Sequence, residues 1–142
     1  MAGSIINFLK QKAVYVRRET LKLHLLSPGT RIASALSPVE IFCVLYYARL
    51  LRFRPSEPNW EERDRLIVSK GHGAFSLYPV LADLGFFSQT ELKKFGSPGA
   101  LLGPIPDCFI PGFETINGSL GNGLGQGCGI ALALKNKKSE AK

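Results

Sequence analysis

Apolar residues recur every three or four positions in the first part of the chain, where they alternate with basic residues. This spacing predicts an amphipathic helix over residues 5–26. The proline and glycine in residues 27–30 end that helix, because both residues stop helical continuation and favour a turn. We expect a loop after the turn, through Ile32 and Ser34.

A second helix is predicted to begin at a capping box. Ser37 and Glu40 have the capping spacing, and Pro38 occupies the first helical position, where its missing N–H costs nothing. Apolar residues then lie on nearly every side as far as Leu50, so this helix is expected to be largely buried. A polar, proline-bearing connector follows it.

Residues 65–69 (RLIVS) form a short apolar run between a charged segment and a glycine. Such a run is typical of a buried strand in a parallel sheet. Residues 70–73 (KGHG) then become a strand-to-helix turn, and a helix is predicted over residues 74–84, closing at Gly85. The predicted fold class is therefore α/β: a partial domain over residues 1–142, rich in helix at its start, with a parallel sheet flanked by helices.

The second half of the chain contains a short helix and a long loop. Ser88 and Glu91 repeat the capping spacing and predict a short helix that ends at Phe95. Residues 96–117 carry prolines and glycines with no sustained period, which predicts a long ordered loop or a functional one. A glycine-punctuated segment then leads into an Ala/Leu helix that ends in lysines.

Composition narrows the class of protein. With 45% hydrophobic and 20% charged residues in 142 positions, the chain is expected to fold as one globular unit. Its longest apolar stretch is far shorter than the roughly 20 residues of a membrane span. The N-terminus lacks the pattern of a signal peptide, so a cytoplasmic location is expected.

The net charge of +7 is compatible with nucleic acid, a phosphorylated ligand or an acidic protein partner. Much of this charge is local, in the first helix and at the C-terminus, where it is typical of solvated faces. No aromatic residues are interleaved with the lysines, so a nucleic-acid-binding module is disfavoured.

The glycine run from Gly118 to Gly129 fits neither common phosphate-binding template, since it contains no GxGxxG and no glycine-lysine-Ser/Thr. Gly121, Gly125 and Gly129 would line one face of a helix and allow another backbone to approach closely. Packing and ligand contact both remain open for these glycines. Gly118 and Leu120 precede the helix and are favoured as ligand contacts.

His72 lies where the predicted strand ends and a helix begins. Free backbone N–H groups at such a place favour an anionic phosphate, to which an imidazole adds a hydrogen bond. A purely structural role is the alternative for a single loop histidine.

Several of these motifs together resemble the transketolase family. The chain reads SKGHG, then Leu77-Tyr78, then FETINGSLGNGLGQGCGIALALK, in the order in which the family carries S-x-GH-x-x-x-x-LY and G-x-LGQG. The SPVEI helix start and the ERDR segment before the apolar run match the same family. The resemblance extends from about Arg17 to Lys138 and corresponds to the N-terminal, thiamine-diphosphate-binding section.

The resemblance implies a thiamine diphosphate site shared between subunits of a two-carbon ketol transferase. His72 matches the histidine that helps to hold the diphosphate, and it is the best candidate for a catalytic residue. Gly118, Ser119 and Leu120 match the segment that lies against the aminopyrimidine ring. The carbanion chemistry belongs to the cofactor, and the protein supplies positioning.

Two departures from the family concern the substrate. The chain has Gly29-Thr30-Arg31 where the family carries SGH, and residues 103–106 (GPIP) where it carries GHP. Both missing histidines would meet the sugar. Arg31 offers a fork of donors to a carboxylate or phosphate, which suggests a substrate other than the usual pentose and hexose phosphates. A surface salt bridge of Arg31 is the equal alternative.

The family's GDG motif, which helps to bind the Mg²⁺ that screens the diphosphate, does not occur in residues 1–142. We therefore assign no metal ligand here and expect these residues alone to bind the cofactor poorly. The activating glutamate is also expected from a partner, either a C-terminal-type transketolase section or a second subunit in a homo- or hetero-oligomer. The competing hypothesis is a truncated, non-catalytic fragment or subunit that only packs against a partner chain.

Overall fold

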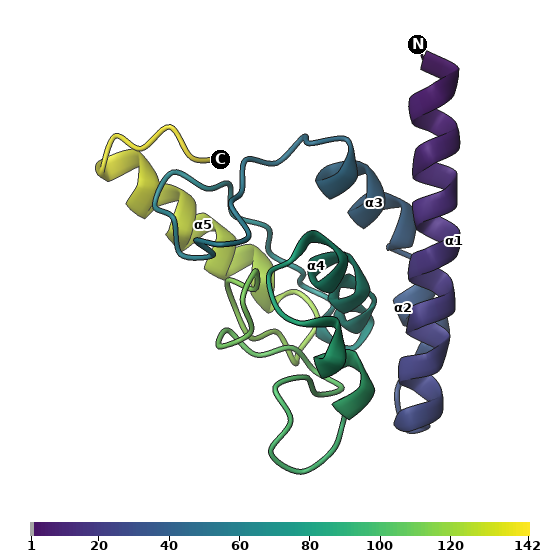
Figure 1. Ribbon diagram of the computed structural model, residues 1–142. Helices are drawn as coiled ribbons and strands as arrows, with labels where there is room; N and C mark the ends of the chain where they lie inside the picture. The colour runs from purple at the N-terminus through teal and green to yellow at the C-terminus, as the bar shows by residue number, and fades with distance from the viewer. Residues whose placement is uncertain (1) are drawn as a thin grey trace.

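The computed structural model describes residues 2–142 as helices joined by long loops, with no β-strand in that range (Figure 1). Met1 lies outside the described residues. The described part contains no helix long and apolar enough to cross a membrane. In order, the elements are α1 (Ala2–Leu26), α2 (Ile32–Leu36), α3 (Val39–Tyr47), the 3₁₀ helix η1 (Gly71–Leu77), α4 (Tyr78–Leu84), the 3₁₀ helix η2 (Gln89–Lys94) and α5 (Asn122–Asn136).

The long first helix confirms the prediction from hydrophobic spacing, although it begins earlier, at Ala2. Val16 and Leu23 are buried on its inner face, as the three- and four-residue periodicity requires. Thr20 is also buried there, and its hydroxyl donates to the Val16 carbonyl at 2.7 Å, which satisfies the only polar group of that side chain. An amphipathic face thus determines the orientation of α1.

The chain between α1 and α3 departs from the prediction. The expected loop through Ile32 and Ser34 is wrong, because α2 forms there and buries Ala35 completely. The predicted helix start before α3 is confirmed, but the capping hydrogen bond is absent from the described residues and Ser37 Oγ donates to the Ser34 carbonyl instead. α3 ends at Tyr47 instead of Leu50, since Arg49 adopts a left-handed backbone with φ 54°.

Two hydrophobic clusters hold the helices together. The first lies between α1, α3 and α4. The second joins α1, α2, η1, α4 and η2 to the long loop that follows η2. In the second cluster the rings of Phe75 and Phe95 stack with centroids 5.8 Å apart, and Tyr78 meets Phe95 edge-on at 6.0 Å. η1 and α4 contribute to both clusters and therefore form the centre of the fold.

The predicted parallel sheet is not confirmed in the part of the chain that the structure describes, which contains helices and no strand. Residues 65–69 run through the molecule without the ladder of a strand. A ladder requires a neighbouring strand to exchange repeated hydrogen bonds. Here the Arg65 N–H donates to the Lys142 carbonyl at 2.7 Å, and one such bond does not make a sheet.

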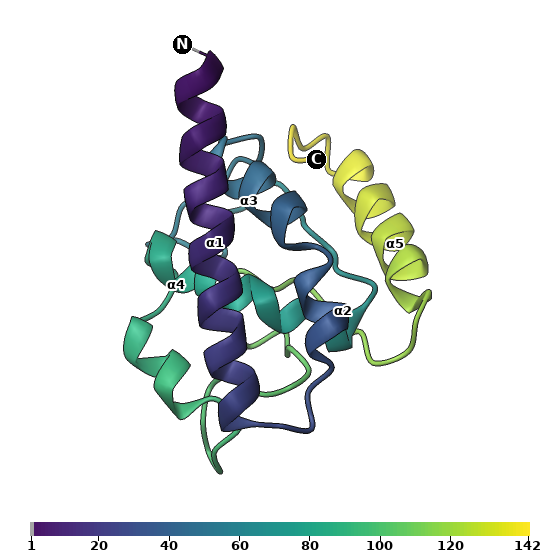
Figure 2. The same cartoon turned by 90° about the vertical axis from the view of Figure 1, so that its right-hand side faces the viewer.

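α5 lies on the far side of the molecule from α1 (Figures 1 and 2). It rests on the extended 65–69 segment. A Cβ at Gly123 would lie 2.6 Å from Ser69 Cβ, and a Cβ at Gly127 would lie 3.4 Å from the Ile67 side chain. The Gly123 N–H donates to Ser69 Oγ at 3.1 Å. Glycine at position 123 is therefore required for this close approach.

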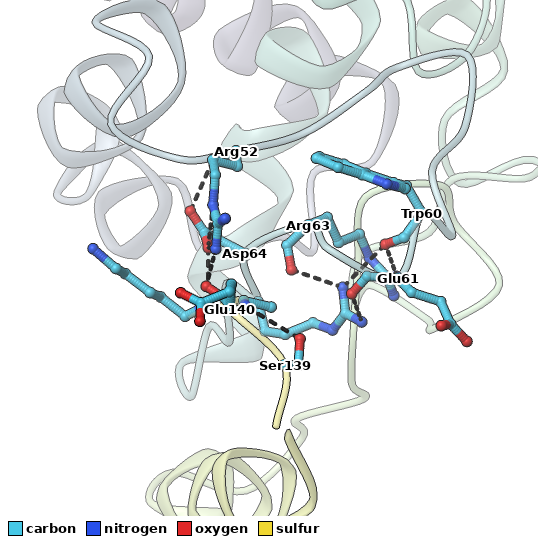
Figure 3. Close-up of polar contacts among 10 residues, drawn as sticks. Arg52, Trp60, Glu61, Arg63, Asp64, Ser139 and Glu140 are labelled. Carbon is cyan, nitrogen blue, oxygen red and sulfur yellow. Dashed lines mark hydrogen bonds and ion pairs between the residues drawn. The ribbon is translucent and has the colours of Figure 1, made fainter. Parts of the chain in front are cut away.

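The end of the chain is held by a charged cluster beside the same segment (Figure 3). Asp64 accepts hydrogen bonds from the backbone N–H groups of Arg52 and Lys142, each at 2.8 Å. The Arg52 guanidinium donates to Asp64 at 3.2 Å and also to the Glu140 carbonyl. Residues 139–142 are thereby fixed against the segments around positions 52 and 64.

Two alanine substitutions in α5 are predicted to have opposite effects on stability. Gly123→Ala is expected to lower the free energy of unfolding by about 1–3 kcal/mol, because the added methyl overlaps Ser69. Gly125→Ala is the matched control: its Cβ meets nothing within 4 Å, so it is expected to raise that free energy by about 0.5–1 kcal/mol through helix propensity. Urea unfolding of both variants measures the difference, and equal effects would contradict this packing.

Acid is predicted to release the Asp64 cluster. Burial raises the pKa of Asp64, but the hydrogen bonds from Arg52 and Lys142 outweigh it and hold the pKa below its ordinary value. The charged form therefore stabilises the fold above pH ~4, and this contribution is lost as the pH falls through the lowered pKa. Asp64→Asn should lower the free energy of unfolding by about 1–3 kcal/mol at pH 7.

Thermal unfolding across pH checks this expectation. The difference in unfolding temperature between wild type and Asp64→Asn should disappear at acid pH, because the protonated carboxyl and the amide are then similar. Glu57→Gln removes an exposed ion pair with Arg54 and serves as the control, with a much smaller effect at pH 7. If this difference in unfolding temperature stayed constant down to pH ~2, the lowered pKa of Asp64 would be excluded as its cause.

Candidate functional site

His72 lies in the first turn of η1, which begins at Gly71 and continues directly into α4. The predicted helix over residues 74–84 is therefore extended by three residues at its start, and its first part is 3₁₀ instead of α. Its predicted end is confirmed, since Gly85 closes α4 with φ 89°. The His72 side chain is half-buried, whereas the glycines on either side of it are fully buried.

The turn that carries His72 is packed against α2. Lys70 Nζ donates to the Ser34 carbonyl at 2.9 Å and to Ser37 Oγ at 2.7 Å. A Cβ at Gly73 would lie 2.8 Å from the same Ser34 carbonyl oxygen. The lysine at position 70 therefore fixes the turn on α2.

The opposite side of the turn is packed against the start of the glycine motif. A Cβ at Gly71 would lie 1.7 Å from the Asn117 carbonyl oxygen, a distance that no side chain permits. Asn117 directly precedes the predicted cofactor contacts Gly118, Ser119 and Leu120. The structure thus brings the His72 turn and the glycine motif into direct backbone contact, although they are far apart in the sequence.

The three residues predicted to face the aminopyrimidine ring form an open segment. Gly118, Ser119 and Leu120 are exposed, and Leu120 retains 67% of its accessible surface. Gly121 then turns the chain into α5 with φ 90°. A Cβ at Gly118 would meet nothing within 4 Å in the described structure, so a flat ring has room to approach this backbone.

The glycine stripe at positions 121, 125 and 129 makes no close contact within residues 2–142, since a Cβ at each would meet nothing within 4 Å. Close packing occurs instead at Gly71, Gly73 and Gly123. The stripe therefore has no packing role within the described residues, and the close approach in α5 lies at Gly123, on a different face of the helix.

Arg31 precedes α2 and is exposed. Its backbone position is fixed by its neighbour Thr30, whose hydroxyl donates to the Ser27 carbonyl at 2.9 Å and lies 2.8 Å from His24 Nδ1. Arg31 forms no ion pair with any other residue in the range 2–142, so the surface salt bridge considered from sequence does not occur there. α2 connects Arg31 to the His72 turn.

Ile105 borders the same turn and was not predicted from the sequence to belong to the site. Its Cγ2 atom would lie 3.6 Å from a Cβ at Gly71. Tyr78 holds this part of the long loop by donating its hydroxyl to the Gly103 carbonyl at 2.8 Å. Burial raises the pKa of Tyr78, which keeps the hydroxyl protonated as a donor. The GPIP segment itself was the available signal, because it stands where a histidine was expected.

Within residues 2–142, no three His, Cys, Asp or Glu side chains gather closely enough to hold a metal ion. The structure therefore brings a histidine turn, an open glycine-rich backbone and an apolar loop side chain together as a candidate site, whereas the exposed Arg31 lies before α2 with no described contact to them. These groups can hold and orient an organic ligand with an anionic part.

Comparisons with known proteins agree with this arrangement. Residues 27–142 match the family "Transketolase, thiamine diphosphate binding domain". A 6-deoxy-6-sulfo-D-fructose transketolase subunit of a Clostridium species is 37% identical over 129 residues, which cover 89% of this chain and 46% of that protein. An apulose-4-phosphate transketolase subunit of Actinobacillus succinogenes is 38% identical over 136 residues, covering 94% and 49% respectively. The chain thus spans about half the length of these curated relatives.

Solved structures show the same similarity in three dimensions. Transketolase from Campylobacter jejuni superposes with a TM-score of 0.86 at 28% identity, over 93% of this chain and 21% of that one. Transketolase from Leishmania mexicana gives 0.81 at 25% identity, over 88% and 19% respectively. The chain therefore belongs to the transketolase family and is a short N-terminal section of its thiamine-diphosphate-binding domain.

Proposed function

We propose that this chain forms part of the thiamine diphosphate site of an enzyme that transfers two-carbon ketol units between sugars or sugar derivatives. One observation carries the proposal: the contact of Gly71 with the Asn117 carbonyl. Through this contact the His72 turn lies beside the segment that leads into Gly118. A ligand with an anionic end and a flat ring could then meet both motifs at once.

The role of this chain's own residues would be to bind and orient the cofactor. The backbone of Gly118, Ser119 and Leu120 is open and fits a flat ring that needs close approach and hydrogen bonds from peptide groups. His72 would meet the diphosphate from the first turn of η1 and is the candidate catalytic residue. Thiamine diphosphate, when bound, supplies the stabilisation of the carbanion, so no strong acid or base is required from these residues.

Mg²⁺ and a partner would complete the site. A diphosphate requires a hard cation with oxygen ligands, and these ligands are proposed to lie outside the described residues. The two relatives above are named as transketolase subunits, which supports a partner section or subunit here as well. The exposed leucines of α5 provide a surface on which such a partner could pack; Leu124 is 75% exposed and Leu132 is 60% exposed.

The same exposed leucines favour a second candidate function. A chain that only packs against a partner, without taking part in catalysis, would also require an apolar face of this kind. Cofactor binding in the assembled protein separates the two candidates.

The substrate is proposed to differ from the common pentose and hexose phosphates. Arg31 is exposed near the start of α2 and is free to offer its guanidinium to a phosphate, sulfonate or carboxylate. Ile105 contributes an apolar group in the segment where the family carries a histidine. The names of the two relatives refer to a sulfo-sugar and to apulose phosphate, which supports substrates outside the common set.

Cofactor affinity is predicted to depend on the partner. Calorimetric titration of this chain with thiamine diphosphate and Mg²⁺ should show weak binding, because residues 2–142 contain no cluster of side chains that could hold the cation. Addition of the partner section should lower the dissociation constant at least about tenfold. Tight binding by the chain alone would contradict the missing metal site, and no binding by the assembled protein would favour the packing-only function.

A pair of histidine variants controls this titration. In the assembled protein, His72→Asn is expected to weaken cofactor binding. His24→Asn alters a histidine that contacts Thr30 and lies on α1, so its cofactor affinity should match wild type.

Arg31 is predicted to determine substrate affinity. In the assembled enzyme, Arg31→Ala should raise KM about 10- to 100-fold for a phosphorylated or sulfonated ketose, which corresponds to the loss of a charged hydrogen-bonding pair. Arg31→Lys keeps the charge without the planar fork, so its KM should lie between those of wild type and Arg31→Ala. Arg18→Ala removes an exposed arginine of α1 and serves as the control. An unchanged KM in Arg31→Ala would exclude this role.

A further inference from the structure

Asn117 carries a buried oxygen that lacks a hydrogen-bond partner. The residue is 3% exposed, and its Nδ2 donates to Thr115 Oγ1 at 2.7 Å. Its Oδ1 is the one buried side-chain polar atom without a partner in the part of the chain that the structure describes. Native proteins rarely leave such an atom unpaired, because burial removes its hydrogen bonds to water without replacement. The orphaned oxygen therefore indicates a missing donor.

A small cavity lies at this residue. Its volume is about 10 Å³, which is close to the space that one water molecule requires. Three polar residues line it, namely Glu114, Thr115 and Asn117. The rest of the lining is apolar and comes from the 66–74 segment, Pro106 and Phe113.

We propose that this cavity binds one ordered water molecule. The water would donate one hydrogen bond to Asn117 Oδ1 and would accept one from the Thr115 hydroxyl. That hydroxyl already accepts from Asn117, so its own proton is available. With its second O–H group the water would donate a hydrogen bond to the Glu114 carboxylate, which has lone pairs beyond those used by Arg63. Three partners are typical of a buried water.

The orientation of the Asn117 amide does not change the chemistry that the cavity requires. If the oxygen and nitrogen of this amide were exchanged, an N–H group would occupy the buried position in place of the oxygen. A water molecule satisfies either atom, because it both donates and accepts. The site therefore requires a ligand of water's chemistry in both cases.

A metal cation fits the cavity less well than water. Its one carboxylate, Glu114, is bound by Arg63 at 2.8 and 2.9 Å and lies 3.7 Å from Arg65 Nε. Two guanidinium groups already balance that charge. A hard cation would need six or so oxygen ligands, and the lining does not supply them.

The water would connect two parts of the structure. Glu114 and its arginine partners belong to the network around residues 60–65, whereas Asn117 leads into Gly118. The bridge would fix the Asn117 side chain next to the Gly71 contact, since Gly71 also lines the cavity. This inference rests on the packing of the chain and not on the proposed function.

A crystal structure of the whole protein, at a resolution that shows ordered waters, tests the site directly. The expected result is one water within hydrogen-bond distance of the Asn117 side chain and at least one of Thr115 and Glu114. An empty cavity, or a protein donor on Asn117 Oδ1, would overturn the proposal.

Two variants of Thr115 provide a matched pair. Thr115→Ser retains the hydroxyl and should retain the water. Thr115→Val has the shape of threonine but no hydroxyl, so the water should be lost or weakly occupied, and the unfolding temperature should fall about 2–6 °C below that of the serine variant. Full occupancy in Thr115→Val would show that Thr115 does not hold the water.

Hydrogen exchange measures the consequence for the loop. The amides of residues 116–120 should exchange several-fold faster in Thr115→Val than in Thr115→Ser, because valine removes both the water bridge and the direct hydrogen bond from Asn117 to Thr115. Equal exchange in the two variants would contradict a role of the water in fixing this segment.

Discussion

The contact between Gly71 and the Asn117 carbonyl oxygen is the constraint on which the candidate site depends. No side chain fits at position 71, so the two backbones touch directly. This contact fixes the distance between the histidine turn and the glycine motif without any side chain that could change rotamer. Gly73 applies the same restriction toward α2, where the Ser34 carbonyl occupies the space of a Cβ. The turn is therefore held from both sides by steric exclusion.

Parts of this arrangement could be predicted because they depend on local sequence. The periodicity of α1, the left-handed Gly85 and the Ala/Leu composition of α5 all act within a few residues, and each of these elements is present. α2 could not be predicted because five residues give no periodic signal, and burial of Ala35 supplies the stabilisation that local propensity lacks. The sheet was expected from an apolar run, but a strand requires a distant neighbour, which no local pattern provides.

The candidate site likewise combines residues marked by local sequence with residues placed by tertiary contacts. His72 and Gly118 could be proposed from the sequence because they lie in motifs with a fixed spacing. The GPIP segment marks the region of Ile105, but its place beside the turn, like that of Asn117, could not be predicted, since it depends on tertiary contacts such as the hydrogen bond of Tyr78 to Gly103. A polar residue in a loop is usually solvated. Burial is what makes Asn117 informative, and burial is a property of the fold.

α5 shows how little contact holds the predicted cofactor segment in place. The helix stands apart from α1 and rests mainly on residues 65–69, with Gly123 against Ser69 near its start (Figure 2). Its other end is secured through residues 139–142, which Asp64 and Arg52 bind (Figure 3). Between these two attachments the leucines remain exposed. Because Gly118, Ser119 and Leu120 lead directly into this helix, any partner that covers α5 would also restrict the segment that is proposed to meet the cofactor.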